Sequence, residues 1–199
     1  MDLRAWRRRL REYDEITNVR PIIRRYFVIG AFDGALTVLG IIIGASAFGD
    51  LEAHKALIVS ASIGAAIALA VSSAVGAYEA ERVEKKLHRH SIERAMLVEL
   101  SGEHRSAFRT AALVSGVVHG VAPVVAALVP VVPFLLMDFR TATIAATVMT
   151  LGFLFGLGAY LGSLVRERIV ITGLRFVATG VGTAAILWLL GAVGVQVVP

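Results

Sequence analysis

Long apolar runs alternate with short polar and basic segments along the chain, and this pattern predicts the elements of the fold. A helix rises about 1.5 Å per residue, so about twenty apolar residues cross the roughly 30 Å hydrocarbon core of a bilayer. Five runs reach this length: Tyr26–Phe48, Ala56–Tyr78, Ala111–Met137, Thr141–Val165 and Phe176–Val198. We therefore expect an all-α membrane protein with five transmembrane helices.

The composition agrees with a membrane protein. Hydrophobic residues make up 57% of the chain and charged residues only 18%, with a mean hydropathy of +0.75. The apolar runs are continuous and rich in Gly and Ala instead of alternating in polarity, which excludes a transmembrane β-barrel. Pro123, Pro130 and Pro133 lie in the third run, so we expect a kinked or broken helix there.

Basic residues are strongly biased toward one side of the predicted bundle. Residues 1–25 hold eight Lys and Arg, residues 79–110 hold seven and residues 166–175 hold three. The connections on the other side hold only Lys55 and Arg140. Because cytoplasmic loops are enriched in Lys and Arg, this bias predicts a cytoplasmic N-terminus. After five spans, the C-terminus then lies outside.

The runs and the charges together divide the chain into four segments. These are a basic cytoplasmic N-terminal segment (1–25), spans one and two (26–78), a cytoplasmic helical segment with candidate metal ligands (79–110) and spans three to five (111–199). No small-residue cleavage site follows a short apolar core near the N-terminus, so we expect no cleavable signal peptide. Residues 2–18 are compatible with an amphipathic helix on the lipid headgroups.

The segment 79–110 is the largest polar piece between two spans. We expect it to begin by continuing the second span as a helix through His88. Ser91 is a residue type that caps helix N-termini, and Ser101-Gly102 is typical of a helix end. The pattern therefore predicts a second, short amphipathic helix over Ile92–Leu100.

Several classes of function lack their signatures. The chain has no Cys, which excludes disulfides, thiolate metal sites and a Cys nucleophile. It also lacks a phosphate-binding Gly loop with Lys, an HExxH motif, a Gly-x-Ser-x-Gly elbow and a nucleotide fingerprint. We therefore expect no enzyme and no prosthetic group. The basic segments lack base-stacking aromatic residues and adjoin the membrane, so anionic lipids are the expected partner and nucleic acid is not.

Asp33 is the acidic residue that lies inside an apolar run. A charge at bilayer depth costs on the order of 3 kcal/mol, so such residues generally face a polar interior or a pathway. On a helix Asp33 shares one side with Thr37, Gly40 and Gly44, a small and polar stripe that fits a pathway or a subunit contact. The alternative is a structural carboxylate that bonds to a neighbouring helix or reaches the cytoplasmic edge.

The second span carries small residues at a spacing of four, which lets helices approach closely. They are Ser60, Gly64, Ala68, Ser72 and Gly76. Helix packing explains this stripe, although Ser72 and Ser73 are also possible oxygen ligands facing Asp33. His119 is the single histidine within a span, and it fits either a metal or proton role or a packing role.

Glu81, Glu84 and His88 have the three- and four-residue spacings that place side chains on one helix face. Carboxylates with imidazole suit Mn(II), Fe(II) or Zn(II), whereas the absence of Cys disfavours Cu(I). The alternative is a solvated helix whose carboxylates form salt bridges with the neighbouring Lys and Arg.

Four sequence segments, which follow one another along the chain, resemble motifs of the vacuolar iron transporter family. Residues 32–37 and 40–45 resemble its Asp-Gly-Leu-x-Thr opening span, and Ser72–Tyr78 resembles its Ser-Met-x-x-Gly-Glu-Tyr segment. Pro130–Phe134 resembles Pro-Leu-x-Pro-Tyr, and the run from Phe153 to Gly191 resembles the last two spans. The resemblance covers about residues 26–195, on five spans with the expected orientation.

This resemblance implies a homodimer with a metal path near the subunit interface, which moves Fe²⁺ or Mn²⁺ out of the cytosol in exchange for protons. Asp33 matches the membrane carboxylate of the family. The motif's Met falls on Ser73, the Glu before its Tyr falls on Ala77, and a further carboxylate falls at about Ala65. The metal-binding segment is also shorter than in the family. Glu81 and Glu84 are its best candidates, followed by Met96, Glu99 and Glu103.

We therefore expect a divalent metal transporter in the plasma membrane of a prokaryote. Glu81, Glu84 and His88 would collect the cation, and Asp33 of each protomer would bind it in the membrane with Thr37 or Ser73 oxygens. Two alternatives remain open. One is a transporter of another solute on the same scaffold, and the other is a non-transporting membrane protein that binds metal or lipid at its cytoplasmic face.

Overall fold

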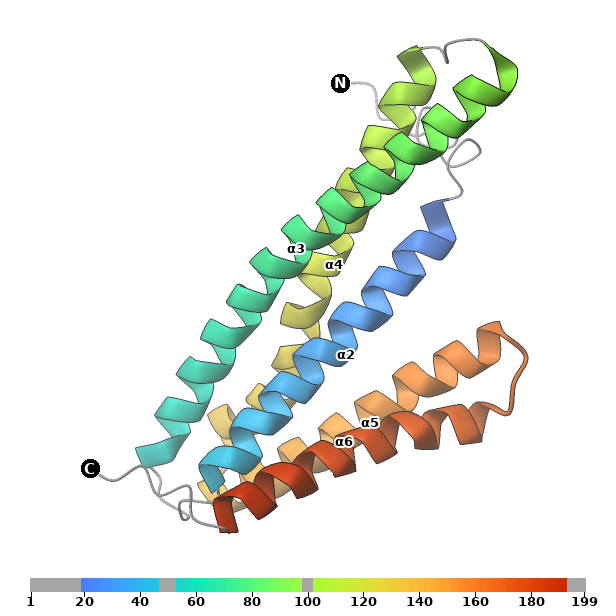
Figure 1. Cartoon of the computed structure of the whole chain (residues 1–199). Coiled ribbons are helices and arrows are strands. Elements are labelled where there is room, and N and C mark those ends of the chain that lie inside the picture. Colours follow the sequence, from blue (N-terminus) through green and yellow to red (C-terminus); the bar gives the residue numbers. More distant parts are fainter. Residues whose placement is uncertain (1–18, 47–52, 98–101, 193–199) are drawn as a thin grey trace. The chain divides into compact units, whose positions relative to one another are not determined.

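The computed structural model describes residues 19–46, 53–97 and 102–192, which are helical apart from short turns (Figure 1). The helices are α2 (Val19–Ser46), α3 (Ala53–Met96), α4 (Gly102–Leu136), α5 (Phe139–Leu164) and α6 (Ile169–Ala192). All five are long and apolar enough to cross a membrane. The predicted all-α class and its five potential spans are confirmed. The amphipathic helix expected over residues 2–18 lies outside the described residues.

The helices extend beyond the apolar runs that predicted them. α2 begins at Val19 instead of Tyr26, and α6 begins at Ile169 instead of Phe176. The basic connection expected over residues 166–175 is therefore mostly helix. Hydropathy marks where a helix faces lipid, whereas the backbone hydrogen bonds that define the helix continue into polar sequence.

α3 is the longest helix in the described part of the chain, with 44 residues. At about 1.5 Å per residue it is about 66 Å long, roughly twice the hydrocarbon thickness of a bilayer. Its apolar part ends at Tyr78, and its charged part runs from Glu79 to Met96. The expected continuation of the second span through His88 is confirmed.

The second cytoplasmic helix, predicted over Ile92–Leu100, is wrong for its described part. α3 continues without a break to Met96, and Leu97 leaves the helix with a positive φ of 54°. The Ser91 hydroxyl donates a hydrogen bond to the carbonyl of His88 at 2.7 Å. Ser91 therefore satisfies its hydroxyl inside α3 instead of capping a new helix. Residues 98–101 lie outside the described residues.

α4 runs as one helix through Pro123, Pro130 and Pro133, so the helix is not broken there. Each proline lacks an N–H and leaves one carbonyl without its usual helical donor. The helical pattern nevertheless continues to its end, where the Met137 N–H donates to the Pro133 carbonyl at 2.9 Å.

The contacts divide the described chain into two compact units. One comprises α2 up to Gly30 with the Ala70–Ala122 part of α3 and α4, and the other comprises Ala31–Leu69 with the chain from Pro123 on. α2, α3 and α4 each contribute to both units. The two units are described separately below.

In the first unit, glycines allow α4 to approach its neighbours closely. A Cβ at Gly116 would lie 2.8 Å from the Ala74 carbonyl oxygen, and one at Gly120 would lie 2.9 Å from that of Ala70. A Cβ at Gly30 of α2 would lie 2.9 Å from the carbonyl oxygen of His119 on α4. These contacts bring the last turns of the apolar part of α3 close to α4, and α4 close to α2.

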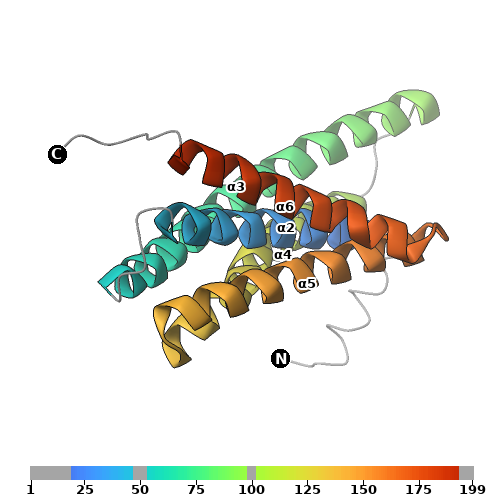
Figure 2. The same ribbon diagram turned by 90° about the horizontal axis from the view of Figure 1, so that it is seen from below.

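The second unit holds an apolar core and the α5–α6 hairpin. The core residues are Val38, Ile42, Ile58, Ala66, Ala127, Val131, Phe134, Phe139, Ala142 and Ala146. α5 and α6 lie side by side in both views (Figure 1, Figure 2), with Gly158 and Gly162 of α5 against Thr172 of α6. Gly152 and Gly156 face open space.

Asp138 caps the N-terminus of α5. Its carboxylate accepts a hydrogen bond from the backbone N–H of Thr141 at 3.0 Å. This bond stabilises the charged form and holds the pKa of the Asp138 carboxyl below its ordinary value of 3.8. The Lys55 ammonium donates to the Met137 carbonyl at 2.7 Å, which ties the start of α3 to the α4–α5 turn.

Candidate functional site

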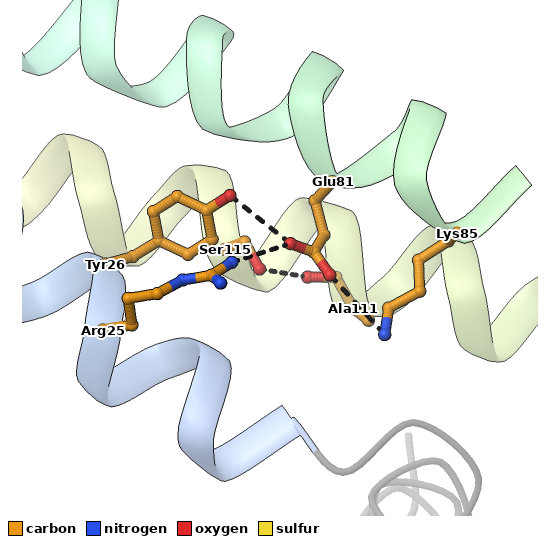
Figure 3. A network of polar contacts seen from close by, with 6 residues as sticks. All are labelled: Arg25, Tyr26, Glu81, Lys85, Ala111 and Ser115. Carbon is orange, nitrogen blue, oxygen red and sulfur yellow. Dashed lines mark hydrogen bonds and ion pairs between the residues drawn. The ribbon is translucent and has the colours of Figure 1, made fainter. Parts of the chain in front are cut away.

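Glu81 is the buried carboxylate of the first unit, with only 4% of its surface exposed. It lies on α3, facing Arg25 and Tyr26 of α2 (Figure 3). One oxygen, Oε2, accepts a long hydrogen bond from the Tyr26 hydroxyl at 3.4 Å and lies 3.6 Å from the Arg25 guanidinium. The other, Oε1, lies 3.5 Å from the Lys85 ammonium one turn along α3.

This arrangement gives Glu81 two cations and one hydroxyl donor. A buried carboxylate is stable only when charges and hydrogen bonds replace the water that it has lost. Lys85 is largely buried, whereas Arg25 is mostly exposed. The network therefore joins α2 to α3 electrostatically at the polar end of the first unit.

α4 contributes its own polar contacts beside this network. The buried Ser115 hydroxyl donates to the Ala111 carbonyl at 2.8 Å within α4 (Figure 3). The ring of His119 lies 5.2 Å from the ring of Tyr26, and its Nδ1 lies 2.8 Å from the Tyr26 carbonyl oxygen. Because a carbonyl only accepts, Nδ1 carries the proton in this contact. His119 therefore has a packing contact with α2.

The other predicted cytoplasmic ligands do not gather around Glu81. Glu84 and His88 are exposed on α3, and the His88 ring lies 6.3 Å from that of Phe108 on α4. Glu99 lies outside the described residues, as does the side chain of Glu103, whose backbone belongs to α4. Among the described residues, no three His, Asp or Glu side chains are grouped to hold a metal ion. Metal binding by these residues stays a prediction.

Asp33 is exposed on α2 in the second unit. Within the described part of the chain it makes no hydrogen bond or ion pair. The next residue, Gly34, is buried, and a Cβ there would lie 2.5 Å from the Pro123 carbonyl oxygen. Thr37 is half-buried on the same helix, and Ser73 is half-buried in the first unit. Their predicted roles as oxygen ligands are not tested by these positions.

The stripe of small residues on α3 is exposed in the part of the chain that the structure describes. Gly64 and Gly76 have no heavy atom within 4 Å of an added Cβ, apart from local backbone. Ser60, Ala68 and Ser72 are also exposed. Among the described residues, Gly116 and Gly120 of α4 make the close contact with α3.

Sequence reasoning missed Arg25 and Tyr26 as partners of Glu81, whereas the pair with Lys85 is one of the salt bridges with neighbouring basic residues that it had allowed. A signal for them was present, because Arg25 and Tyr26 mark the polar edge of the first apolar run. A carboxylate just beyond the second run reaches the same depth if these two helices are neighbours. Tertiary packing decides which helices are neighbours, and no local sequence pattern contains this information.

Comparison with known proteins adds evidence that the geometry alone does not supply. Residues 79–192 match the model of the VIT family, which is more than half of the chain. The chain belongs to the VIT family. It is also 32% identical over 171 residues to an uncharacterized protein of Methanocaldococcus jannaschii, and this match covers 83% of the chain and 87% of that protein.

Membership of the VIT family confirms the resemblance found in the sequence. The family consists of membrane transporters of metal ions and not of enzymes. Together with five helices that are long and apolar enough to span a bilayer, it identifies a multi-pass membrane protein of the ion-transporter class.

Proposed function

We propose that the protein exports Fe²⁺ or Mn²⁺ from the cytosol in exchange for protons, as a homodimer in the plasma membrane of a prokaryote. Its membership of the VIT family supports metal transport in general. The observation that carries the specific proposal is Asp33, an exposed carboxylate that has no partner among the described residues and lies on a helix that can span the membrane.

The exposure of Asp33 supports a dimer. A carboxylate that faces lipid hydrocarbon is costly, so residues of this kind face a bundle interior or a polar path. Within its own unit Asp33 has no such cover. A second copy that contacts this face of α2 would shield it and bring two carboxylates to one path. The exposed small residues of α3, from Gly64 to Gly76, are suited to a close helix contact of the same kind.

Hard oxygen ligands suit Fe²⁺ and Mn²⁺ better than softer metals. In the proposed path Glu84 and His88 collect the cation at the cytoplasmic end, with Glu81, Glu99 and Glu103 as further ligands. Asp33 then binds it in the membrane with Thr37 or Ser73 oxygens. Glu81 can take part only if a cation displaces Arg25 and Lys85, because these two side chains now neutralise it.

The same carboxylate couples the metal to protons. A carboxyl group must lose its proton to bind a metal, so metal binding releases protons and protonation releases metal. If protons enter from outside while the metal site faces outward, each cycle exchanges protons for a cation. Asp33 of each protomer carries this step in the proposal.

The experiment is metal uptake by vesicles that contain purified Asp33→Asn protein. Asn keeps the shape of Asp but has no titratable charge, so proton-driven Fe²⁺ or Mn²⁺ uptake falls to background while dimer yield is retained. Asp138→Asn is the matched control, because it makes the same change outside the spans and Asn is an equally good helix cap. This control transports at the normal rate.

The opposite pattern would contradict the proposed mechanism. A purely structural Asp33 predicts that Asp33→Asn lowers thermal stability but keeps most of the transport per folded protein. Transport of neither metal by the unmodified protein would contradict the metal specificity.

Transport of another solute is the second candidate function. It is favoured by one observation, since the described residues contain no cluster of three metal-ligating side chains. The same vesicles distinguish the two candidates. If the vesicles take up another cation and this uptake depends on Asp33, that cation is the substrate. The proposed path through Asp33 then stays the same.

A further inference from the structure

Residues of α3 and α4 line a basic pocket at the polar end of the first unit. Its volume is about 330 Å³. Five basic side chains line it together with two aromatic rings and one small residue: Arg82, Lys85, Lys86, Arg89, Arg109, Tyr78, Phe108 and Ala112. None of the described residues that line it is acidic. The pocket is therefore a cationic cavity with an aromatic and apolar wall.

Carboxylates outside the pocket neutralise three of the five cations. Arg82 pairs with Glu79 at 3.0 Å, Lys85 with Glu81 at 3.5 Å, and Arg89 with Glu93 at 3.6 Å. Within the described ranges Lys86 and Arg109 have no carboxylate partner. The pocket thus keeps about two positive charges for a ligand.

Arg89 supplies a second, independent observation. Its Nε is buried and, among the described residues, has no hydrogen-bond acceptor, because Glu93 lies beyond hydrogen-bond distance. Buried donors in folded proteins are nearly always satisfied. An anion with several acceptor oxygens would satisfy this donor and pair with Lys86 and Arg109. Phosphate has this chemistry, because guanidinium groups bind it through parallel N–H donors and Lys binds it as a point charge.

The position of the pocket along the helices indicates where such a group comes from. Tyr78 is the last residue of the uncharged part of α3, and Ala112 lies one turn inside the uncharged part of α4. The basic residues follow immediately on the polar side. Exposed Val75 and Leu113 continue the helices on the apolar side. Lipid headgroups lie at this boundary, and their acyl chains lie on its apolar side.

We propose that the pocket between α3 and α4 binds a phosphate group, which the headgroup of an anionic phospholipid presents at the membrane surface. Lys86, Arg109 and Arg89 hold the phosphate oxygens, and Phe108 and Tyr78 contact the glycerol and the first part of the chains. A soluble phosphate compound has the same charge chemistry but lacks the acyl chains, so the two sources can be separated experimentally.

The test uses the full-length protein in detergent and counts bound lipid by native mass spectrometry. Dioleoyl phosphatidylglycerol is compared with dioleoyl phosphatidylcholine, and glycerol 1-phosphate is added as a competitor. We expect the unmodified protein to retain phosphatidylglycerol in preference to phosphatidylcholine. The double variant Lys86→Gln, Arg109→Gln loses this retention by a factor on the order of ten, from the typical contribution of basic residues at an anionic membrane surface.

The control is the double variant Arg24→Gln, Arg94→Gln. It removes the same charge from exposed positions of α2 and α3 in the same unit, outside the pocket, and it keeps the preference. Lys86→Glu serves as a second test, because Lys86 is exposed and a charge reversal there leaves the core intact. Thermal unfolding checks that all variants are folded.

Each outcome decides the proposal. Loss of retention in the pocket variants alone supports it. Displacement of the lipid by millimolar glycerol 1-phosphate supports the phosphate site but assigns it to a soluble ligand. Equal retention in the pocket variants and the unmodified protein overturns it, as does an equal loss in the control, which would indicate only a general charge effect.

Discussion

Glu81 and Glu84 lie three residues apart on α3, yet their surroundings differ completely. Glu81 is buried among Arg25, Tyr26 and Lys85, whereas Glu84 is exposed. Both have the spacing of metal ligands, and the sequence treats them alike. In the fold, one carboxylate joins two helices and the other is free to meet a cation from solution.

At the scale of single residues, the first prediction compares Glu81→Gln with Glu84→Gln. Glu81→Gln leaves the largely buried Lys85 ammonium without its counter-charge, so we expect a loss of about 1–3 kcal/mol in the free energy of unfolding. Glu84→Gln changes it by less than about 0.5 kcal/mol, as is usual for an exposed position. Thermal unfolding in detergent measures both.

Calorimetric titration with Mn²⁺ completes this comparison. Glu84→Gln weakens binding at the cytoplasmic end without a loss of stability, because it removes one hard oxygen ligand. Equal and small stability changes in both variants would contradict the structural role that we assign to Glu81. Unchanged metal binding in both variants would support the alternative interpretation, in which the charged end of α3 is a solvated helix without a metal site.

At the scale of elements, the fold depends on where glycines meet backbone. Gly34 of α2 lies against Pro123 of α4, and an added Cβ there would be 2.5 Å from the carbonyl oxygen and 2.6 Å from the Cα. These are main-chain atoms that cannot rotate away. Gly152 of α5 is exposed and has nothing within 4 Å of an added Cβ among the described residues.

The substitution Gly34→Ala is therefore expected to destabilise the protein, and Gly152→Ala is not. Forcing a methyl group into a filled contact typically costs about 1–3 kcal/mol. Gly152→Ala is expected to stabilise α5 by about 0.5–1 kcal/mol, because Gly loses more conformational freedom than Ala in a helix. Thermal unfolding of the two variants in one detergent is the measurement. A similar shift in both would show that α2 and α4 are not in close contact at Gly34.

At the scale of the whole molecule, the charge bias predicts an orientation that the fold alone does not show. The chain contains no Cys, so one introduced Cys reports its own position. Ser91 is exposed on the charged part of α3, and Thr141 is exposed at the start of α5. With a cytoplasmic N-terminus, these two positions lie on opposite sides of the membrane.

We expect a membrane-impermeant maleimide to label Thr141→Cys in intact cells and to label Ser91→Cys only after permeabilisation. The reason is the asymmetry of Lys and Arg between the two sides. Tags at residues 1 and 199 should likewise report opposite sides. Labelling of both Cys variants in intact cells, or both tags on one side, would contradict the five-span topology.

The local pattern of the chain was sufficient to predict the five helices, their membrane class and the family. A span of about twenty apolar residues is a local property, because a bilayer has a fixed thickness and every backbone polar group must be satisfied within the helix. The same reasoning failed at element ends. α2 and α6 begin earlier than expected, within basic sequence, and Ser91 lies inside α3 instead of starting a helix.

The tertiary structure decided which polar residues meet. Glu81 and Tyr26 are 55 positions apart in the chain, and the basic pocket combines α3 residues with Phe108 and Arg109 of α4. Periodicity places a side chain on a face of its own helix, but it does not say which helix that face contacts. The burial of Glu81, the exposure of Asp33 and the clustering of basic side chains in the pocket follow from helix packing, which depends on contacts between residues distant in sequence.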